Sequence, residues 1–311
     1  MRVVFFGSPD AALPALRGLL ASGHSIELVV TQPDKPAGRG RKFSASPVKE
    51  FAVSRGLPVF QPEKIRKDLA APEKLEAARA DIFVVVAYGQ ILPREIIDIP
   101  PHKTVNIHFS LLPEYRGAAP VQAALLDGKK RTGVTLFRLN EKMDEGDILT
   151  RSETEITPGE NAGELEARLA GIGTALLLET LPRLDAVPLV PQDPAAATLA
   201  PKIRKEDGLI SWRGEAARID RQVRAFTPRP SAFTSFMGQR LIILRGTPVT
   251  AAAGFNPPGT VHRITREGLE ICCEGGTLYR IERLQPESRD AMEAFAFTLN
   301  GRIRPGDELG K

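Results

Sequence analysis

The sequence predicts a doubly wound α/β domain with a Rossmann-like, mostly parallel sheet at residues 1–185, followed by a smaller β-barrel domain at 208–311. In the first part, short apolar segments alternate with helical patterns, which is typical of a parallel sheet covered by helices. Four prolines mark residues 186–207, and this density predicts an extended, semi-rigid linker. Beyond the linker, short strand-like segments separated by Gly and Pro indicate a small barrel.

The first helix is expected to begin directly after a strand at residues 3–6. Ser8 is predicted as its N-cap and Pro9 as its first residue, because Ser accepts a backbone hydrogen bond there and Pro needs no donor. The apolar side of this helix consists of Ala11, Leu13, Leu16, Leu19 and Leu20. Further helices are predicted at 47–55, 118–126 and 162–181, and further strands at 26–30, 57–60, 82–87, 104–108, 133–139 and 148–156.

After the linker, a helix is predicted at 214–225 and strands at 240–244, 259–264, 269–273 and 277–284. The adjacent Cys272 and Cys273 end one of these strands, where they would point to opposite faces and would not form a relaxed disulfide. We interpret both as structural. The four histidines have no zinc-type spacing, so we expect no metal site.

Composition narrows the class of protein. No apolar run approaches the length of a membrane span, and the N-terminus has neither a secretory signal nor a transit peptide. We therefore expect a cytoplasmic monomer without a membrane partner. Residues 208–311 carry 15 Lys and Arg against 11 Asp and Glu, whereas residues 1–207 have 27 of each. An excess of this size is often just a solvated surface and only weakly indicates a polyanionic partner.

The strand at 104–108 carries a candidate site at its carboxyl end, where open α/β sheets bind ligands. Asn106 and His108 are two residues apart, so both would face the same side of the strand. A non-titrating amide donor beside an imidazole, with a carboxylate to orient the ring, suits acyl transfer to an amine. Taken alone, the same residues also suit a structural role at a strand end. The first strand-to-helix turn lacks G-x-G-x-x-G, so no nucleotide cofactor is expected.

Residues 106–113 (Asn-Ile-His-Phe-Ser-Leu-Leu-Pro) resemble the signature of the formyltransferases that use 10-formyltetrahydrofolate. Residues 143–147 (Met-Asp-Glu-Gly-Asp) resemble the aspartate loop of the same family, at the expected distance. The resemblance implies Asn106, His108 and Asp144 as the catalytic residues. It favours Asp144 over two other carboxylates, Asp147 and Asp10, which suit the start of a strand and the first turn of a helix.

Three features distinguish among the branches of this family, which act on a purine precursor, a nucleotide-linked aminosugar, initiator tRNA or the formyl-folate itself. Residues 31–42 form a basic, Gly- and Pro-rich loop that resembles the tRNA-gripping insert of the tRNA-specific branch, although on charge alone it would be a solvated loop. Residues 116–120 (Arg-Gly-Ala-Ala-Pro) resemble the tRNA- and sugar-specific branches. Residues 224–230 resemble the start of an OB-like second domain that binds tRNA, except that Arg229 replaces a frequent aromatic residue.

The resemblance thus implies formyl transfer from the cosubstrate 10-formyltetrahydrofolate to the amino group of initiator methionyl-tRNA, for translation initiation. It implies tRNA contacts at Arg39, Arg41 and Lys42. It implies folate contacts at Ser110, Leu111, Leu112 and Pro113, and a pterin pocket that uses the backbone of Ala87, Tyr88, Gly89, Gln90, Ile91 and Leu92. Two alternatives are a formyltransferase for an amino-sugar nucleotide and a non-catalytic tRNA- or folate-binding module. The basic loop argues against the first, and the complete Asn, His and Asp set argues against the second.

Overall fold

The computed structural model describes residues 1–37, 42–250, 256–299, 301 and 303–311. The chain divides into two compact units. The first comprises Met1–Pro120, Arg131–Glu155 and Glu166–Pro201, and the second comprises Val121–Lys130, Ile156–Leu165 and Lys202–Lys311. The domain limits predicted at residues 185 and 207 stay predictions, because compactness alone does not define a domain.

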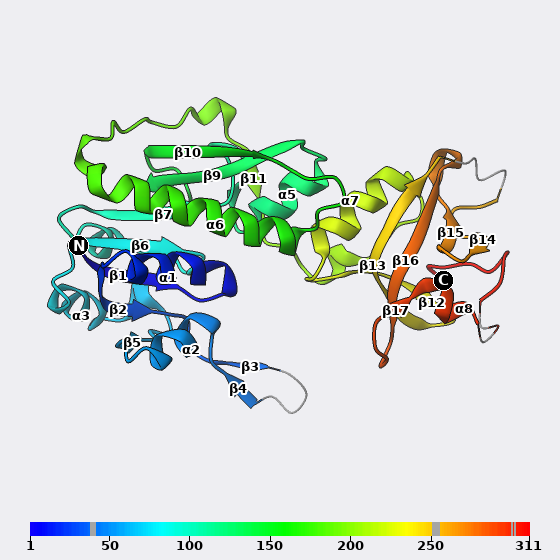
Figure 1. Cartoon of the computed structure of the whole chain (residues 1–311), viewed down its shortest axis with the longest axis horizontal. Coiled ribbons are helices and arrows are strands. Elements are labelled where there is room, and N and C mark those ends of the chain that lie inside the picture. The colour runs from blue at the N-terminus through cyan, green and yellow to red at the C-terminus, as the bar shows by residue number, and fades with distance from the viewer. Residues whose placement is uncertain (38–41, 251–255, 300, 302) are drawn as a thin grey trace. The chain divides into compact units, whose positions relative to one another are not determined.

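A seven-stranded sheet lies at the centre of the first unit (Figure 1). Its strands are β1 (Arg2–Gly7), β2 (Ser25–Val30), β5 (Val59–Phe60), β6 (Ile82–Val86), β7 (Thr104–His108), β9 (Arg131–Arg138) and β10 (Ile148–Glu155). Their order is β10-β9-β7-β6-β1-β2-β5; the neighbours from β5 to β7 are parallel, and β9 is antiparallel to both of its neighbours. The chain thus proceeds outward from β1 in both directions, as the predicted doubly wound fold requires.

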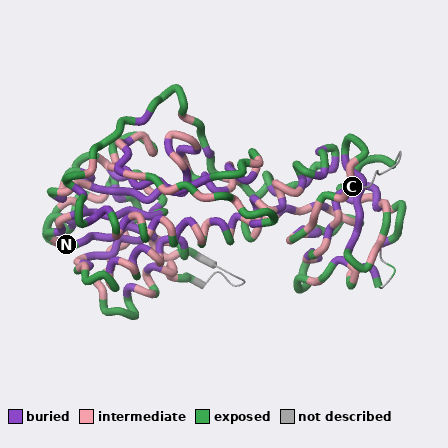
Figure 2. Tube along the Cα trace, turned by 45° about the horizontal axis from the view of Figure 1, so that its top comes forward, coloured by how far each residue is buried: buried purple, intermediate pink, exposed green. Residues whose placement is uncertain are grey.

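Helices cover both faces of this sheet. On one face, α1 (Leu13–Ala21) packs beside α2 (Pro47–Ser54). It also packs closely against α6 (Ala162–Thr180), because Gly18 of α1 has no side chain where Thr174 of α6 approaches. The other face packs against α3 (Ala71–Ala77) and α4 (Arg94–Ile97), whose apolar residues share one core cluster with β1, β2 and β6. Every residue of β6 and β7 is buried, and the sheet forms a largely buried block in Figure 2. A short 3-10 turn, η2 (Ile65–Lys67), precedes α3.

The start of the first helix differs from the prediction. Ser8 is not an N-cap: its hydroxyl accepts a hydrogen bond from the backbone N–H of Gln32 at 3.0 Å. A 3-10 turn, η1 (Asp10–Ala12), follows, and α1 begins only at Leu13, with Pro14 in its first turn. Since β1 and β2 are parallel neighbours, their carboxyl ends lie side by side, and the Ser8 hydroxyl joins the two strands instead of capping a helix.

The predicted linker also differs, because its first part packs on the first unit. A 3-10 segment, η3 (Leu181–Ala186), leads into the predicted linker, and Val190 within it pairs with Ile148 at the edge of β10. After a second turn, η4 (Pro194–Ala196), the strand β11 (Leu199–Ala200) pairs in parallel with β8 (Arg116–Gly117). The prolines predicted a semi-rigid spacer, and this stays a prediction. They carried no information about the strand edge to which the segment binds.

The basic loop contributes a short hairpin. Its strands are β3 (Lys35–Ala37) and β4 (Lys42–Ser44), which pair antiparallel. The predicted tRNA-contacting residues Arg39 and Arg41 lie outside the described residues. Lys42 is the first residue of β4, and the described part of the chain includes its backbone only.

The second unit contains an antiparallel sheet with strand order β12-β13-β16-β15-β14, and a short strand, β17, pairs with β16. The strands are β12 (Ala232–Phe236), β13 (Gln239–Val249), β14 (Val261–Thr265), β15 (Gly268–Cys272), β16 (Leu278–Pro286) and β17 (Met292–Glu293). Its helical segments are α5 (Pro120–Leu126), η5 (Glu206–Gly208), α7 (Ala216–Phe226), η6 (Glu274–Gly276) and α8 (Ala294–Thr298). Together, the two units confirm the predicted fold class, a Rossmann-like domain followed by an OB-like antiparallel one.

The two cysteines point to opposite faces of the sheet, as predicted. Cys273 belongs to the main core of the second unit, together with Trp212 and Ile271, whereas Cys272 packs with Leu278 in a separate small cluster. Both thiols are free and buried. Burial raises the pKa of the Cys273 thiol to about 12, which suits a structural residue.

Candidate active site

The parallel pair β6 and β7 places the candidate residues at the carboxyl edge of the sheet. Asn106 lies beside Val85 of β6 and Phe137 of β9, and His108 lies beside Thr135 of β9. Both side chains share one face of β7. The intervening Ile107 faces the opposite side, where it contacts α6 at Gly173. The two-residue spacing therefore places the amide and the imidazole on the same face of β7, as the sequence predicted.

The His108 ring is held by backbone and by packing. Its Nε2 lies 2.9 Å from the carbonyl oxygen of Tyr115, and its plane is nearly perpendicular to the Phe137 ring at a centroid distance of 6.4 Å. Only 6% of the side chain is exposed. A carbonyl can only accept, so Nε2 carries the proton and donates it. Nδ1 is then the nitrogen left for other partners.

Asp144 lies on the Nδ1 side of that ring. Its Oδ2 is 3.7 Å from His108 Nδ1 and accepts a hydrogen bond from the backbone N–H of Gly117 at 2.8 Å. The distance to His108 is within ion-pair range and beyond that of a hydrogen bond. The side chain is 15% exposed, so a reacting group that approaches the pair meets a mostly desolvated carboxylate.

The Asn106 amide makes no hydrogen bond to any residue in the described part of the chain, although the side chain is buried. A buried amide normally has partners, since leaving one unsatisfied costs free energy. Its donor hydrogens are thus available to a bound group at the edge where His108 and Asp144 meet.

The two other candidate carboxylates lie elsewhere. Asp147 directly precedes β10, and its backbone carbonyl accepts from Arg138 while its carboxylate pairs with no described residue. Asp10 is exposed on η1 and interacts with Glu166, whose pKa is raised by burial first and by the Asp10 charge second. Asp144 is the carboxylate that the fold brings to His108.

Some of the residues predicted to contact folate have exposed side chains, and others have side chains buried in the core. Among residues 87–92, Ala87, Gly89 and Ile91 are exposed, whereas Tyr88 and Leu92 pack in the core. Gln90 is used internally: it accepts from the N–H of Ile65 and donates to the carbonyls of Pro62 and Glu63.

Residues 110–113 divide in the same way. The Ser110 hydroxyl donates to the Glu114 carbonyl at 2.6 Å, and Leu112 packs against Phe137 and Ile148. Leu111 and Pro113 are half-buried. A ligand at this edge would meet backbone groups and the side chains of Leu111 and Pro113, because the other two side chains are occupied.

Two residues at the site were not assigned a role from sequence. Arg116 is buried and donates from Nε and Nη2 to Gln192 Oε1 at 3.0 and 2.9 Å. Gln192 donates in turn to the carbonyls of Asp144 and Gly146 at 2.8 and 2.7 Å. Arg116 stood in a motif noted for its family resemblance. Gln192 lies in the predicted linker and had no local signal at all.

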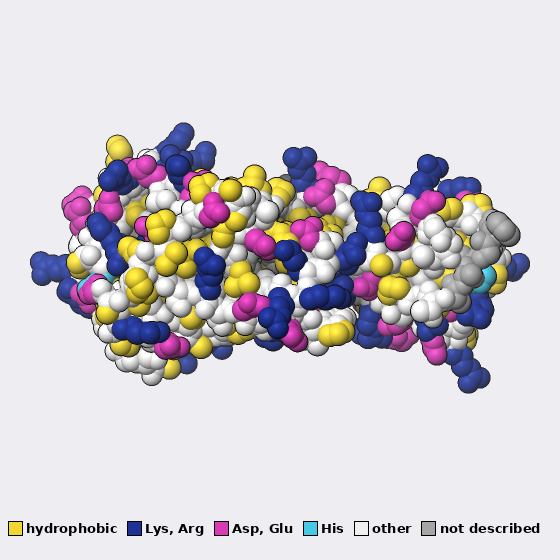
Figure 3. All heavy atoms as spheres, turned by 90° about the horizontal axis from the view of Figure 1, so that it is seen from above, with side chains coloured by type: hydrophobic (Ala, Val, Ile, Leu, Met, Phe, Trp, Pro, Cys, Tyr) yellow, Lys and Arg dark blue, Asp and Glu magenta, His cyan; other side chains and the backbone are white. Residues whose placement is uncertain are grey.

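The basic residues of the second unit are less available than their number indicated. Arg224, Arg245, Arg263 and Arg280 each pair with at least one carboxylate. Side chains of both signs are also interspersed over the face drawn in Figure 3. The predicted affinity of this unit for phosphates would therefore have to come from its other basic residues.

Within the described part of the chain, no helix combines the length and apolarity needed to cross a bilayer. The same residues contain no cluster of three or more His, Cys, Asp or Glu side chains arranged to hold a metal ion.

Comparison with known families decides the relationship. A family model described as formyl transferase matches residues 1–181, and one described as formyl transferase, C-terminal domain, matches residues 202–301. The chain belongs to the formyl transferase family. This confirms the resemblance carried by residues 106–113. A relative in this family from Geotalea uraniireducens, named methionyl-tRNA formyltransferase, is 44% identical over 316 residues, which cover 100% of this chain and 98% of the relative.

Solved structures of formyl transferases share the fold. A methionyl-tRNA formyltransferase from Clostridium thermocellum has a TM-score of 0.58 at 18% identity and covers 79% of this chain and 93% of its own. An N-formyltransferase from Helicobacter canadensis, in complex with folinic acid and dTDP-3-aminofucose, has a TM-score of 0.68 at 18% identity and covers 91% and 98%. Enzymes for both kinds of amine thus resemble this chain, so the fold alone does not identify the acceptor.

Proposed function

We propose that this chain transfers the formyl group of 10-formyltetrahydrofolate to the α-amino group of initiator methionyl-tRNA. The observation that carries the chemistry is the His108–Asp144 pair, 3.7 Å apart, beside the unbonded amide of Asn106. The acceptor is supported by the 44% identity, along the entire chain, to a relative named methionyl-tRNA formyltransferase.

In this proposal, Asn106 and His108 stabilise the charge that develops when the amine attacks the formyl carbon. The new C–N bond leaves an oxyanion on the former formyl oxygen. Asn106 Nδ2 donates one hydrogen bond to it without titrating. Protonated His108 donates a second from Nδ1, since its Nε2 is committed to the Tyr115 carbonyl. Preorganised donors of this kind are worth about 10²–10³ in rate each.

Asp144 and His108 then move the protons that the transfer requires. The attacking amine loses one proton, which Asp144 accepts directly or through one water. The bond between the formyl carbon and folate N10 breaks, and the departing N10 receives a proton from His108 Nδ1. Return of the proton from Asp144 to His108 Nδ1, directly or through one water, restores the enzyme. The net change is exchange of the formyl group for a proton, and no covalent enzyme intermediate is needed.

The cosubstrate would bind along the carboxyl edge of β6 and β7. Ala87, Gly89 and Ile91 are exposed and follow β6, and Leu111 and Pro113 are half-buried and follow β7, the strand that carries Asn106. We assign recognition of the pterin mainly to backbone N–H and C=O groups of residues 87–92. The basic loop would contact the acceptor end of the tRNA through Arg39, Arg41 and Lys42.

The test is transfer of labelled formyl from the folate to methionyl-tRNA, to an amino-sugar nucleotide, or to neither. We expect transfer to the tRNA, reduced by about 10²–10³ in kcat in Asn106→Ala and in His108→Ala. His102→Ala is the matched control, because His102 lies just before the amino end of the same strand and pairs with Asp185 at the surface. Transfer to the sugar alone would refute the acceptor, and a few-fold loss in either variant would refute that residue's role.

A further inference from the structure

We propose that the segment Gln192–Ala200, within the predicted linker, positions the catalytic groups, and that Gln192 holds the loop that carries Asp144. This inference rests on the proposed function for its kinetic consequence. Its structural basis is a set of hydrogen bonds between three segments that are far apart in sequence: residues 115–117, 144–146 and 192–200.

Gln192 uses its whole hydrogen-bonding capacity in this contact. Its two N–H groups donate to the carbonyls of Asp144 and Gly146, at 2.8 and 2.7 Å. Its oxygen accepts from Nε and Nη2 of Arg116 at 3.0 and 2.9 Å. The amide orientation follows from these partners: the reverse would set oxygen against two carbonyls and an NH₂ group against a guanidinium.

The Asp144 loop needs such support because its backbone is strained and tightly packed. Asp144 has a φ of 55°, in the left-handed region that L-residues seldom adopt. Gly146 has no room for a side chain, since a Cβ there would collide with the carbonyl oxygen of Arg138. Gln192 bonds the carbonyls of both residues, so it holds the loop at the turn that directs the Asp144 carboxylate toward His108.

The same linker segment supports the His108 side of the pair. Tyr115, whose carbonyl accepts from His108 Nε2, donates its own N–H to the Thr198 hydroxyl at 2.8 Å. Gly117, whose N–H bonds Asp144, belongs to β8, which pairs with β11. Gly117 has a φ of 122°, and a Cβ there would lie 2.6 Å from the carbonyl oxygen of Ala200, so only glycine allows this approach.

Residues 115–117 thus hydrogen-bond one atom of His108 and one atom of Asp144, and residues 192–200 in turn bond residues 115–117. The separation of His108 and Asp144 is set by this arrangement, because neither side chain hydrogen-bonds the other. Gln192 and Thr198 touch no reacting atom in this scheme and are positioning residues.

The experiment compares Gln192→Ala and Gln192→Glu in the full-length protein. The Glu variant keeps the size and the oxygen that faces Arg116, but loses both donors to the loop. We expect each to lower kcat about 10²-fold with KM for folate and tRNA within about three-fold, since misplacing a catalytic group by about 1 Å costs this much. Gln222→Ala is the matched control, as Gln222 bonds the carbonyls of Asp207 and Leu209 in the second unit.

A double-mutant cycle separates positioning from general stability. In the Asp144→Asn background, Gln192→Ala should cost less than about three-fold, because residues that act through one group are non-additive. A full, additive loss in that background, or Gln192→Glu with the parent kcat, would overturn the inference.

Amide hydrogen exchange gives a readout that does not depend on turnover. We expect faster exchange at Gly117 and residues 143–147 in both Gln192 variants than in the parent and in Gln222→Ala. If the parent transfers formyl to neither acceptor, the proposed function falls, and this exchange difference still decides the positioning role: unchanged protection would refute it.

Discussion

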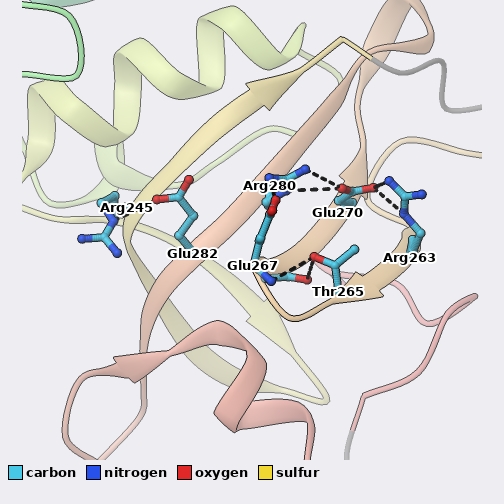
Figure 4. A network of polar contacts seen from close by, with 8 residues as sticks. Arg245, Arg263, Thr265, Glu267, Glu270, Arg280 and Glu282 are labelled. Atoms are coloured by element: carbon cyan, nitrogen blue, oxygen red, sulfur yellow. Dashed lines mark hydrogen bonds and ion pairs between the residues drawn. The ribbon is translucent and has the colours of Figure 1, made fainter.

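Removal of the buried Glu270 carboxylate should destabilise the second unit by about 3 kcal/mol, at the lower end of the range for breaking a buried ion pair. Glu270 lies on β15 with none of its side chain exposed. Its Oε2 accepts from Nε and Nη2 of Arg263 at 3.0 and 2.8 Å, and its Oε1 accepts from Nε and Nη2 of Arg280 at 3.3 and 3.0 Å (Figure 4). Glu270→Gln keeps the shape and removes the charge.

We expect a loss at the lower end of this range because both arginines can interact with other partners when the Glu270 charge is removed. Arg263 is 55% exposed and can turn toward water, and Arg280 also pairs with Glu267. Glu267 itself is 69% exposed, so Glu267→Gln should cost no more than about 1 kcal/mol. Glu267 lies in the turn that joins β14 and β15, and its variant is the control for the loss of one acidic charge.

The assay is urea unfolding followed by tryptophan fluorescence. The chain has one tryptophan, Trp212, and it is buried in the core of the second unit with Leu269 and Ile271, the residues on either side of Glu270. Its signal therefore follows the unit that contains the substitution. With a slope of about 2 kcal/mol per molar urea, the midpoint should fall by about 1.5 M in Glu270→Gln. A shift no larger than that of Glu267→Gln would refute the reasoning.

Three further predictions concern the site and the thiols. Asp144→Asn should lower kcat nearly as much as His108→Ala, and the double variant should lose far less than the product of the two losses; independent action would give multiplying losses. Arg39→Ala should raise KM for methionyl-tRNA while folate titrations stay unchanged, with partial recovery in Arg39→Lys, because a point charge replaces a planar fork; equal KM values would remove Arg39 from the tRNA interface. Cys273, whose pKa burial raises to about 12, should resist a thiol reagent at pH 8 in the native protein and react after unfolding in urea, and rapid native labelling would contradict its burial.

Local patterns predicted the elements whose signal lies within a few residues. The apolar run at 82–87 and the strand at 104–108 correspond closely to β6 and β7, because a parallel strand buried on both faces needs continuous apolar sequence. The prediction of Ser8 as a helix cap was wrong because the partner of its hydroxyl comes from a distant segment of the chain. Ser8 has a suitable side chain for a cap. The pairing of β1 with β2 brings Gln32 beside it, however, and the Ser8 hydroxyl accepts a hydrogen bond from the Gln32 backbone N–H.

The sequence by itself determined the fold class, the family and the shared strand face of Asn106 and His108, since two-residue alternation is a local property of a strand. The tertiary structure decided what surrounds them. It fixed the tautomer of His108 through the Tyr115 carbonyl, and it brought Asp144 to the Nδ1 side. It also brought Gln192, which lies 48 residues beyond Asp144, into hydrogen-bonding contact with the Asp144 carbonyl. The prolines around Gln192 predicted only a spacer. Hydrogen bonds between distant segments depend on how strands and loops pack, and no periodicity of the chain encodes them.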